Sequence, residues 1–192
     1  MTIKLVGSSS GSVALDAPAS TTGGANIEFK LPVADGSNGQ VLQTNGSGQL
    51  SFVDHYSFRA RSSSSAWQSF GTTNFTIIPF NATDFDSGSN YNTSTYKYII
   101  PIAGKYYFYT QMIHDGSDNN SGNSGRIRIY VGSDIVAQGK SGRQGESVNC
   151  STIWDCTVGE EIYVHGAVGN TNADDWIGGS HQSFFNGYFI GP

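Results

Sequence analysis

The chain has 192 residues, a formal net charge of -5 and only 13% charged residues. Aromatic residues make up 12% and Gly numbers 25, a composition that excludes a disordered chain and is typical of a β protein with many turns. Duplex nucleic acid is not an expected partner, because its binding depends on clustered Lys and Arg, which this sequence lacks. Membrane insertion is not expected either, because no stretch is long and apolar enough.

The first 54 residues form a segment of their own, with short apolar runs between turns rich in Gly, Ser and Asn. Candidate strands lie at 13–15, 27–31, 41–43 and 50–53. The turn residues at 45–48 predict a hairpin between the last two. Such short strands cannot bury a core alone, so we expect an extended β stalk that pairs with the same segment of sister chains. A flexible low-complexity linker is the alternative.

Three motifs in this segment carry a resemblance: VALDAPAS at 13–20, FKLPVADG at 29–36 and GQVLQTNGSGQLSF at 39–52. Together they resemble the repeat of tail-fibre and fibre-like virion proteins of tailed bacteriophages, notably marine ones. The resemblance covers most of residues 11–54. It implies a trimeric fibre on the virion, assembled in the host cytoplasm, whose amino-terminal end binds other virion proteins.

The cellular compartment is also indicated by two local features. The first ten residues carry no apolar run typical of a signal peptide, so we expect the chain to fold in a cytoplasm. Cys150 and Cys156 lie on one predicted strand, about 20 Å apart along an extended chain, which is too far for a disulfide between them. We therefore expect two reduced, partly buried thiols.

Residues 55–192 alternate aromatic and β-branched runs with turn residues, which predicts a second, compact β domain. Its candidate strands lie at 56–61, 75–80, 96–100, 105–114, 126–131, 134–138, 147–157, 161–167 and 182–191. The short connections are 101–104, 132–133 and 158–160, and the long, polar ones are 81–94, 115–125, 139–146 and 168–181. Because consecutive connections of an antiparallel sandwich fall at opposite ends, we expect short turns at a base and long loops at an apex.

The stretch 96–112 predicts a hairpin, because two aromatic and β-branched runs flank Pro101 and Gly104. Its second strand has aromatic side chains at the consecutive positions 106–109, and hence on both faces. One face can pack against the other sheet of a sandwich, and a neighbouring subunit is the simplest cover for the second. The residues expected at the subunit interface are Tyr107, Tyr109, Phe184, Phe185 and Tyr188.

Four motifs of this domain carry a second resemblance, and they lie at 91–98, 101–108, 158–164 and 184–190, the last reading FFNGYFI. Residues 56–192 are similar to the globular head of the first complement component and to the tumour necrosis factor family. The resemblance implies a ten-strand antiparallel jelly roll, preceded here by the β stalk, that forms a homotrimer with both chain ends at the base. Glu160 stands where that family commonly has Asp, which weakens any transfer of ligand specificity.

The sequence does not predict an enzyme. The adjacent carboxylates at 160–161 and 174–175 would point apart on a strand, whereas a glycosidase needs two that face one cleft. The four His residues show no metal-ligand spacing, and no Ser lies in a Gly-x-Ser-x-Gly motif. No cofactor is expected, and calcium is left open as an alternative because Asp residues at 84–86 and 115–118 could supply oxygen ligands.

Receptor binding is expected on the apex loops. Trp176 on a polar loop beside two Asp residues could stack on a sugar ring while the carboxylates accept hydrogen bonds, or it could fold back over the sandwich. The candidate set is His114, Asp115, Asp118, Lys140, Arg143, Asp174, Asp175 and Trp176. The expected partner is a glycan or protein of the host-cell surface. The alternatives are a purely structural fibre or capsid-decoration protein and, least favoured, a depolymerase.

Overall fold

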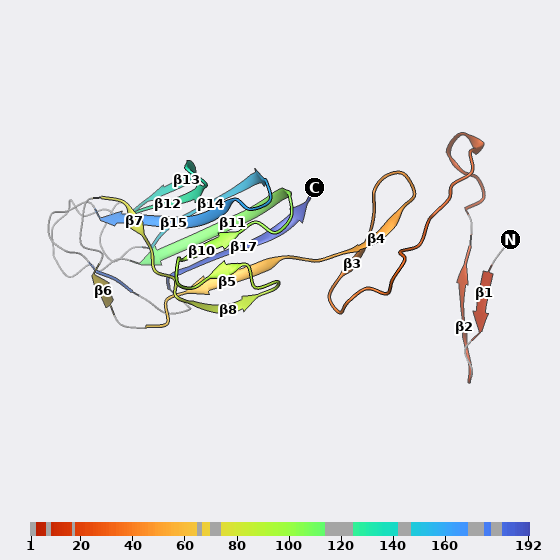
Figure 1. Cartoon of the computed structure of the whole chain (residues 1–192), viewed down its shortest axis with the longest axis horizontal. Helices are drawn as coiled ribbons and strands as arrows, with labels where there is room; N and C mark the ends of the chain where they lie inside the picture. Colours follow the sequence, from red (N-terminus) through yellow and green to blue (C-terminus); the bar gives the residue numbers. More distant parts are fainter. Residues whose placement is uncertain are drawn as a thin grey trace. The chain divides into compact units, whose positions relative to one another are not determined.

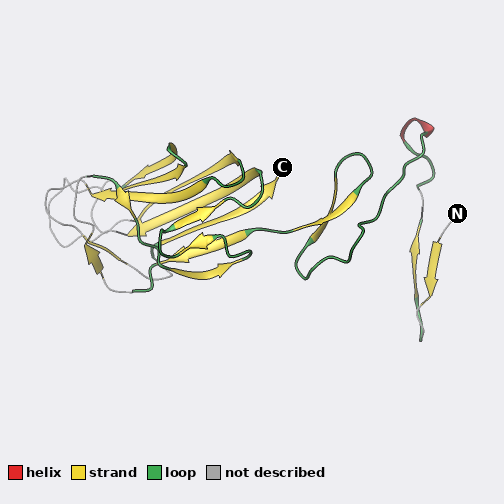
Figure 2. Ribbon diagram, in the orientation of Figure 1, coloured by secondary structure: helices red, strands yellow, loops and turns green. Residues whose placement is uncertain are grey.

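The structure is a computed structural model that describes residues 3–6, 9–16, 18–64, 67–69, 74–113, 125–141, 147–168, 175–177 and 182–192. It divides into two compact units, Met1–Asp54 and His55–Pro192, here called the amino-terminal unit and the head. Strands dominate the head, whereas the amino-terminal unit is mostly loop with four short strands (Figure 2), and the one helical turn among the described residues is the 3-10 turn η1 (Thr22–Gly24). No described helix has the length and apolarity needed to span a membrane.

The amino-terminal unit contains two antiparallel hairpins. Strand β1 (Ile3–Val6) pairs with β2 (Ser12–Leu15), and β3 (Val41–Thr44) pairs with β4 (Leu50–Val53). The predicted turn at 45–48 is confirmed, because the Asn45 side-chain oxygen accepts hydrogen bonds from the backbone N–H groups of Ser47 and Gln49. An Asn that bonds to the backbone two residues on is a common way to close such a turn.

The predicted strand at 27–31 is wrong. This segment makes a single parallel bridge between Lys30 and Gln49, with hydrogen bonds from Lys30 N–H to the Gly48 carbonyl and from Leu50 N–H to the Lys30 carbonyl. One bridge is too little for a ladder, and the apolar side chains of Ile27 and Phe29 are exposed, so no packing holds the segment as a strand.

The head is a sandwich of two antiparallel sheets (Figure 1). The first, called the β15 sheet, has the order β13 (Asp134–Lys140), β12 (Gly125–Val131), β15 (Glu161–Val168), β10 (Lys97–Ile99) and β9 (Tyr91–Asn92), with β7 (Thr76–Ile77) also paired to β15. The second, called the β11 sheet, has the order β14 (Ser147–Cys156), β11 (Gly104–Ile113), β17 (Phe184–Gly191), β5 (Ser57–Arg61) and β8 (Ala82–Asp86). A separate pair joins β16 (Asp175–Ile177) to β6 (Trp67–Ser69). This arrangement confirms the predicted all-β sandwich.

The core lies between the two sheets and follows from side-chain alternation. Every second residue of β11 and β12 is buried, so each strand gives one face to the core. The Phe58 ring stacks on the Tyr98 ring with centroids 4.1 Å apart, which joins the two sheets at the centre. The largest fully buried side chains are Tyr98, Tyr106, Phe58, Phe80, Phe108, Phe185, Ile78, Ile100, Met112, Ile127 and Ile129.

Gly187 on β17 makes room for this aromatic core. A Cβ atom at position 187 would lie 2.6 Å from a ring carbon of Phe108 and 2.9 Å from one of Phe58. Any side chain here would force the two rings apart, because contacts this short are repulsive. The glycine of the closing FFNGYFI stretch is therefore explained by packing.

The predicted hairpin at 96–112 is wrong, because its two strands belong to different sheets. β10 pairs with β9 and β15, whereas β11 pairs with β14 and β17. The chain crosses from one layer to the other at Pro101 and enters β11 at Gly104, whose φ of +138° suits glycine. The predicted long loop at 81–94 is also wrong, since it contains β8 and β9.

The short turns gather at one end of the head, as predicted. The Gly159 N–H donates to the Ile100 carbonyl and the Gly132 N–H donates to the Glu161 carbonyl, which brings all three short connections together. Both chain ends of the head lie there too, because the Phe189 N–H donates to the Tyr56 carbonyl and Gly191 pairs with Lys105. At the other end, the strand termini meet in the pairs Ile113 with Ser147 and Gly125 with Val168.

Candidate functional site

The apex set predicted from the sequence falls mostly outside the described residues, where His114, Asp115, Asp118, Arg143 and Asp174 lie. Lys140 ends β13 and is exposed, with Arg126 as its neighbour on β12. The backbones of Asp175 and Trp176 belong to β16 and pair with Ser69 and Gln68 on β6. The apex site therefore stays a prediction.

The outward face of the β11 sheet carries a row of aromatic and aliphatic side chains. Tyr107 on β11 lies between Ile153 on β14 and Tyr188 on β17, and its ring centroid is 5.4 Å from that of Tyr188. One row further along, the Tyr109 ring lies 5.6 Å from the Phe184 ring. Burial raises the pKa of the Tyr109 hydroxyl above its ordinary value, and that hydroxyl donates to the Gln111 side-chain oxygen. These rings form two aromatic contacts on a face that also carries the polar residues Ser151, Asn186 and Gln111.

Phe185, which the sequence placed at the subunit interface, belongs instead to the core of its own chain. It is 0% exposed, and its ring lies 5.0 Å from the Phe58 ring in an edge-to-face contact. The physical reason is that side chains alternate between the two faces along β17. Phe184 and Tyr188 point outward, so Phe185, which directly follows Phe184, points inward. Of the pair Phe184 and Phe185, only Phe184 is available to a partner.

A charged edge borders this apolar surface on β5 and β8. Asp84 accepts from both Arg59 at 3.3 Å and Arg61 at 2.6 Å, and the Arg59 guanidinium carbon lies 4.3 Å from the Phe184 ring centroid. Asp86 is also committed, because its carboxylate accepts a hydrogen bond from the Tyr91 N–H. Among the described residues, no group of three or more His, Cys, Asp or Glu is placed to hold a metal ion.

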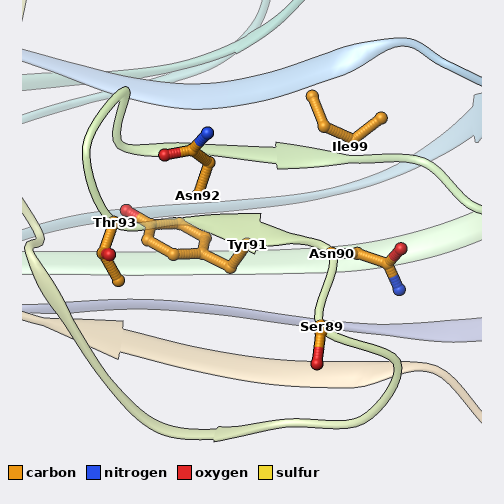
Figure 3. A pocket seen from close by; sticks show the side chains of 6 residues that line it. All are labelled: Ser89, Asn90, Tyr91, Asn92, Thr93 and Ile99. Atoms are coloured by element: carbon orange, nitrogen blue, oxygen red, sulfur yellow. The ribbon is translucent and has the colours of Figure 1, made fainter.

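A pocket of about 520 Å³ opens beside β9 (Figure 3). Its lining residues are Ser89, Asn90, Tyr91, Asn92, Thr93 and Ile99. None is a carboxylate, imidazole, amine or thiol, so the pocket offers neutral hydrogen-bonding groups and no general acid or base near neutral pH. Burial raises the pKa of Tyr91 far above its ordinary value, and its hydroxyl already donates to the Phe80 carbonyl at 3.0 Å.

The outward face of the β15 sheet carries a second concentration of aromatic and charged groups, which the sequence reasoning missed. Arg126, Arg128 and Tyr130 share the outward face of β12, and Tyr163 and His165 share that of β15. The signal was present in the sequence as Arg-x-Arg-x-Tyr and Tyr-x-His at strand spacing. Strand pairing places Arg128 beside His165 and Tyr130 beside Tyr163.

Comparison with known families identifies the architecture. The model of the C1q domain matches residues 40–190, which include most of the head. The chain belongs to the C1q-domain family. No curated protein sequence matches it.

Solved structures agree on the C1q fold at low sequence identity. The globular domain of zebrafish complement 1qA protein is 14% identical with a TM-score of 0.51, and the match covers 71% of this chain and 98% of that one. Murine APRIL at pH 8.0 is 13% identical with a TM-score of 0.53 over 71% and 100% of the two chains. Eiger TNF from S. frugiperda is 12% identical with a TM-score of 0.53 over 71% and 93%. The predicted resemblance to complement heads and tumour necrosis factors is thereby confirmed for the fold.

The two cysteines of this C1q-domain chain play a packing role. Both are free and buried, which confirms the prediction of reduced thiols. Burial raises the pKa of Cys150 to about 12 and that of Cys156 to about 12. Since the thiolate is the reactive form, neither thiol acts as a nucleophile near neutral pH.

Proposed function

We propose that this C1q-domain protein is a trimeric fibre or spike protein of a virion and that its head binds a receptor on the host-cell surface. Residues 1–54 would attach it to other virion proteins, as their resemblance to phage fibre repeats suggests. The proposed activity is binding and not catalysis. C1q-like domains are typically binding modules, and trimers are typical of the family.

The observation that carries the proposal is the apolar outward face of the β11 sheet. Ile153 is 61% exposed and Tyr188 is 44% exposed on a face that also presents Tyr107, Tyr109 and Phe184. A contiguous apolar surface on a soluble chain usually marks an interface. Full burial of an exposed side chain of this size contributes about 1.5–3 kcal/mol, and less for the partly buried Tyr107, Tyr109 and Phe184, so a second and third copy of the same face are its simplest cover.

Tyr109→Asp tests the assembly. In a trimer the new carboxylate would be buried against Phe184 and its counterparts without a partner, at a cost of several kcal/mol, roughly 3–5. Light scattering should give a trimeric mass for the wild-type chain and a smaller mass for the variant. A well-behaved wild-type monomer would remove the basis of the proposal.

The virion assignment has its own test. An antibody raised against the head should label fibre or spike tips when purified virions are imaged by electron microscopy. Labelling spread over the capsid would favour the decoration protein, which is the alternative function. Virions that carry no label would rule out both. Adsorption of the purified trimer to host cells then separates a receptor-binding head from a purely structural one, because a structural head would not adsorb.

A further inference from the structure

The outward face of the β15 sheet carries a cationic and aromatic strip. We define the strip by its side chains, which are Phe75, Lys97, Arg126, Arg128, Tyr130, Tyr163 and His165. They come from β10, β12 and β15 and from the residue that precedes β7. All seven are partly exposed. The strip lies on the opposite sheet from the apolar face proposed for the trimer.

One half of the strip is aromatic. The Tyr130 and Tyr163 rings are parallel within 3°, with centroids 5.2 Å apart, and the His165 ring lies 4.7 Å and 5.1 Å from the two. The Lys97 ammonium lies 5.0 Å from the Tyr163 centroid and forms an ion pair with Glu161 at 2.6 Å. The three rings lie side by side on the sheet, and each ring packs against the other two.

The other half is cationic. The Phe75 ring centroid lies 3.6 Å from the guanidinium carbon of Arg128 and 5.1 Å from that of Arg126. Stacking on an aromatic face fixes the plane of a guanidinium group. The Nε of Arg128 donates to the Gln138 side-chain oxygen at 2.6 Å, and among the described residues no carboxylate pairs with Arg128. Its terminal nitrogens are thus held in a fixed orientation with their charge uncompensated by an ion pair.

Charge distribution makes this strip unusual for the chain. The protein is acidic, with a net charge of -5 and ten Lys and Arg in all, yet three of the ten belong to the strip. Lys140 adds a fourth beside Arg126. Lys97 is paired with Glu161, and on the other sheet Arg59 and Arg61 share the single carboxylate of Asp84. A local excess of cations on an acidic chain selects an anionic partner.

We propose that the strip binds an acidic polysaccharide, with Arg126, Arg128 and Lys97 bound to its carboxylate or sulfate groups and the aromatic rings packed against its sugars. A guanidinium group can bind either kind of anion through two parallel N–H···O hydrogen bonds. Aromatic side chains with a polar atom suit a sugar, which has apolar faces and polar hydroxyl groups. Arg126, Arg128 and Tyr130 alternate along one strand about 7 Å apart, which forms a row and suits a polymer with repeated charges. This binding site requires neither the trimer nor a virion.

The test uses the full chain and three polysaccharides of matched length: a polyuronate, a sulfated dextran and neutral dextran. Calorimetry should detect binding of the polyuronate, the sulfated dextran or both, and no binding of neutral dextran. Arg128→Gln should weaken the binding by about tenfold or more, since a hydrogen bond to a charged group is lost. The matched control is Lys4→Gln, which removes one charge from an exposed position on β1, outside both the strip and the face proposed for the trimer, and should leave the affinity unchanged.

Arg128→Lys tests whether weaker binding comes from a loss of fold. It keeps the positive charge and removes only the planar, two-pronged guanidinium group. It should melt as the wild type does and still bind more weakly. The His165 ring resonance should shift on titration with the acidic polymer and stay unchanged with neutral dextran, which localises the ligand. Tighter binding of the polyuronate would identify carboxylate as the group that the strip recognises, and tighter binding of the sulfated dextran would identify sulfate. Three results would overturn the proposal: no binding of either acidic polymer, equal binding of neutral dextran, or an equal loss of affinity in Lys4→Gln.

Discussion

Replacing Ile153 by Asp tests whether the apolar face of the β11 sheet is a subunit interface. Ile153 is 61% exposed on β14, where it lies opposite Tyr107. Ile135 provides a matched control, because it is 49% exposed on β13 of the opposite sheet and lies opposite Tyr130. Both substitutions exchange the same residue types on a strand, so any loss of β propensity should be similar. The two substitutions differ in the sheet that receives the new carboxylate, the β11 sheet for Ile153→Asp and the β15 sheet for Ile135→Asp.

The destabilisation caused by the new Asp depends on whether a neighbouring subunit covers the side chain. In a monomer both variants change an exposed side chain, and each should shift the free energy of unfolding by no more than about 0.5–1 kcal/mol. In a trimer an unpaired carboxylate buried at each interface costs about 3–5 kcal/mol. Three interfaces then lose about 9–15 kcal/mol, which corresponds to roughly six to eleven orders of magnitude in the trimer association constant.

Size-exclusion chromatography with light scattering distinguishes the two outcomes at micromolar concentration. We expect Ile153→Asp to elute as a folded monomer or as an aggregate and Ile135→Asp to remain a trimer. Circular dichroism of both variants checks that the head is still folded. If Ile153→Asp stays trimeric with the melting temperature of the wild type, the face is not an interface and the reasoning from its exposure fails.

Three further predictions concern the core, the partly buried imidazole of His165 and the apex. Gly187→Ala should lower the free energy of unfolding by about 1–3 kcal/mol, measured by urea denaturation, because the new methyl group would overlap the Phe108 and Phe58 rings; an unchanged midpoint would contradict this packing. His165 has a pKa below its ordinary value of 6.5, because it is partly buried and faces Arg128 and Lys97, with Tyr130 and Tyr163 as its ring neighbours. The unfolded chain therefore takes up more protons as the pH falls through 6.5, so the wild type should lose stability between pH 7.5 and 5.5 more steeply than His165→Gln, and parallel curves would refute this. Trp176→Ala should abolish adsorption to host cells at an unchanged melting temperature, whereas a lower melting temperature with adsorption retained would assign Trp176 to packing.

The strand pattern of the head was predictable because alternation is local. Tyr107 and Tyr109 share one face of β11, and their neighbours Tyr106 and Phe108 share the other, whichever strands lie alongside. The turn at 45–48 was predictable for the same reason, since its hydrogen bonds are made within five residues. The closing FFNGYFI stretch also carried the family resemblance, and Gly187 within it is now explained by the space that two rings require.

The pairing of strands was harder to predict, because it depends on distant segments. The runs on either side of Pro101 look like a hairpin by composition, yet each finds partners elsewhere in the chain, β10 with β15 and β11 with β17. Alternation likewise identified two faces of β17 without telling which faces the core, so Phe185 was assigned to the wrong side. The strip was missed because Phe75 lies about fifty residues before the arginines on which it stacks.

A crystal structure of the assembled protein tests the central claim most directly, because it shows what covers the outward face of the β11 sheet. We predict three chains around a three-fold axis, with Tyr107, Tyr109 and Ile153 of each buried against its neighbours and the strip on the β15 sheet facing solvent. An assembly in which the β11 face is open to solvent and the β15 face is buried would contradict both the proposed trimer and the proposed polysaccharide site.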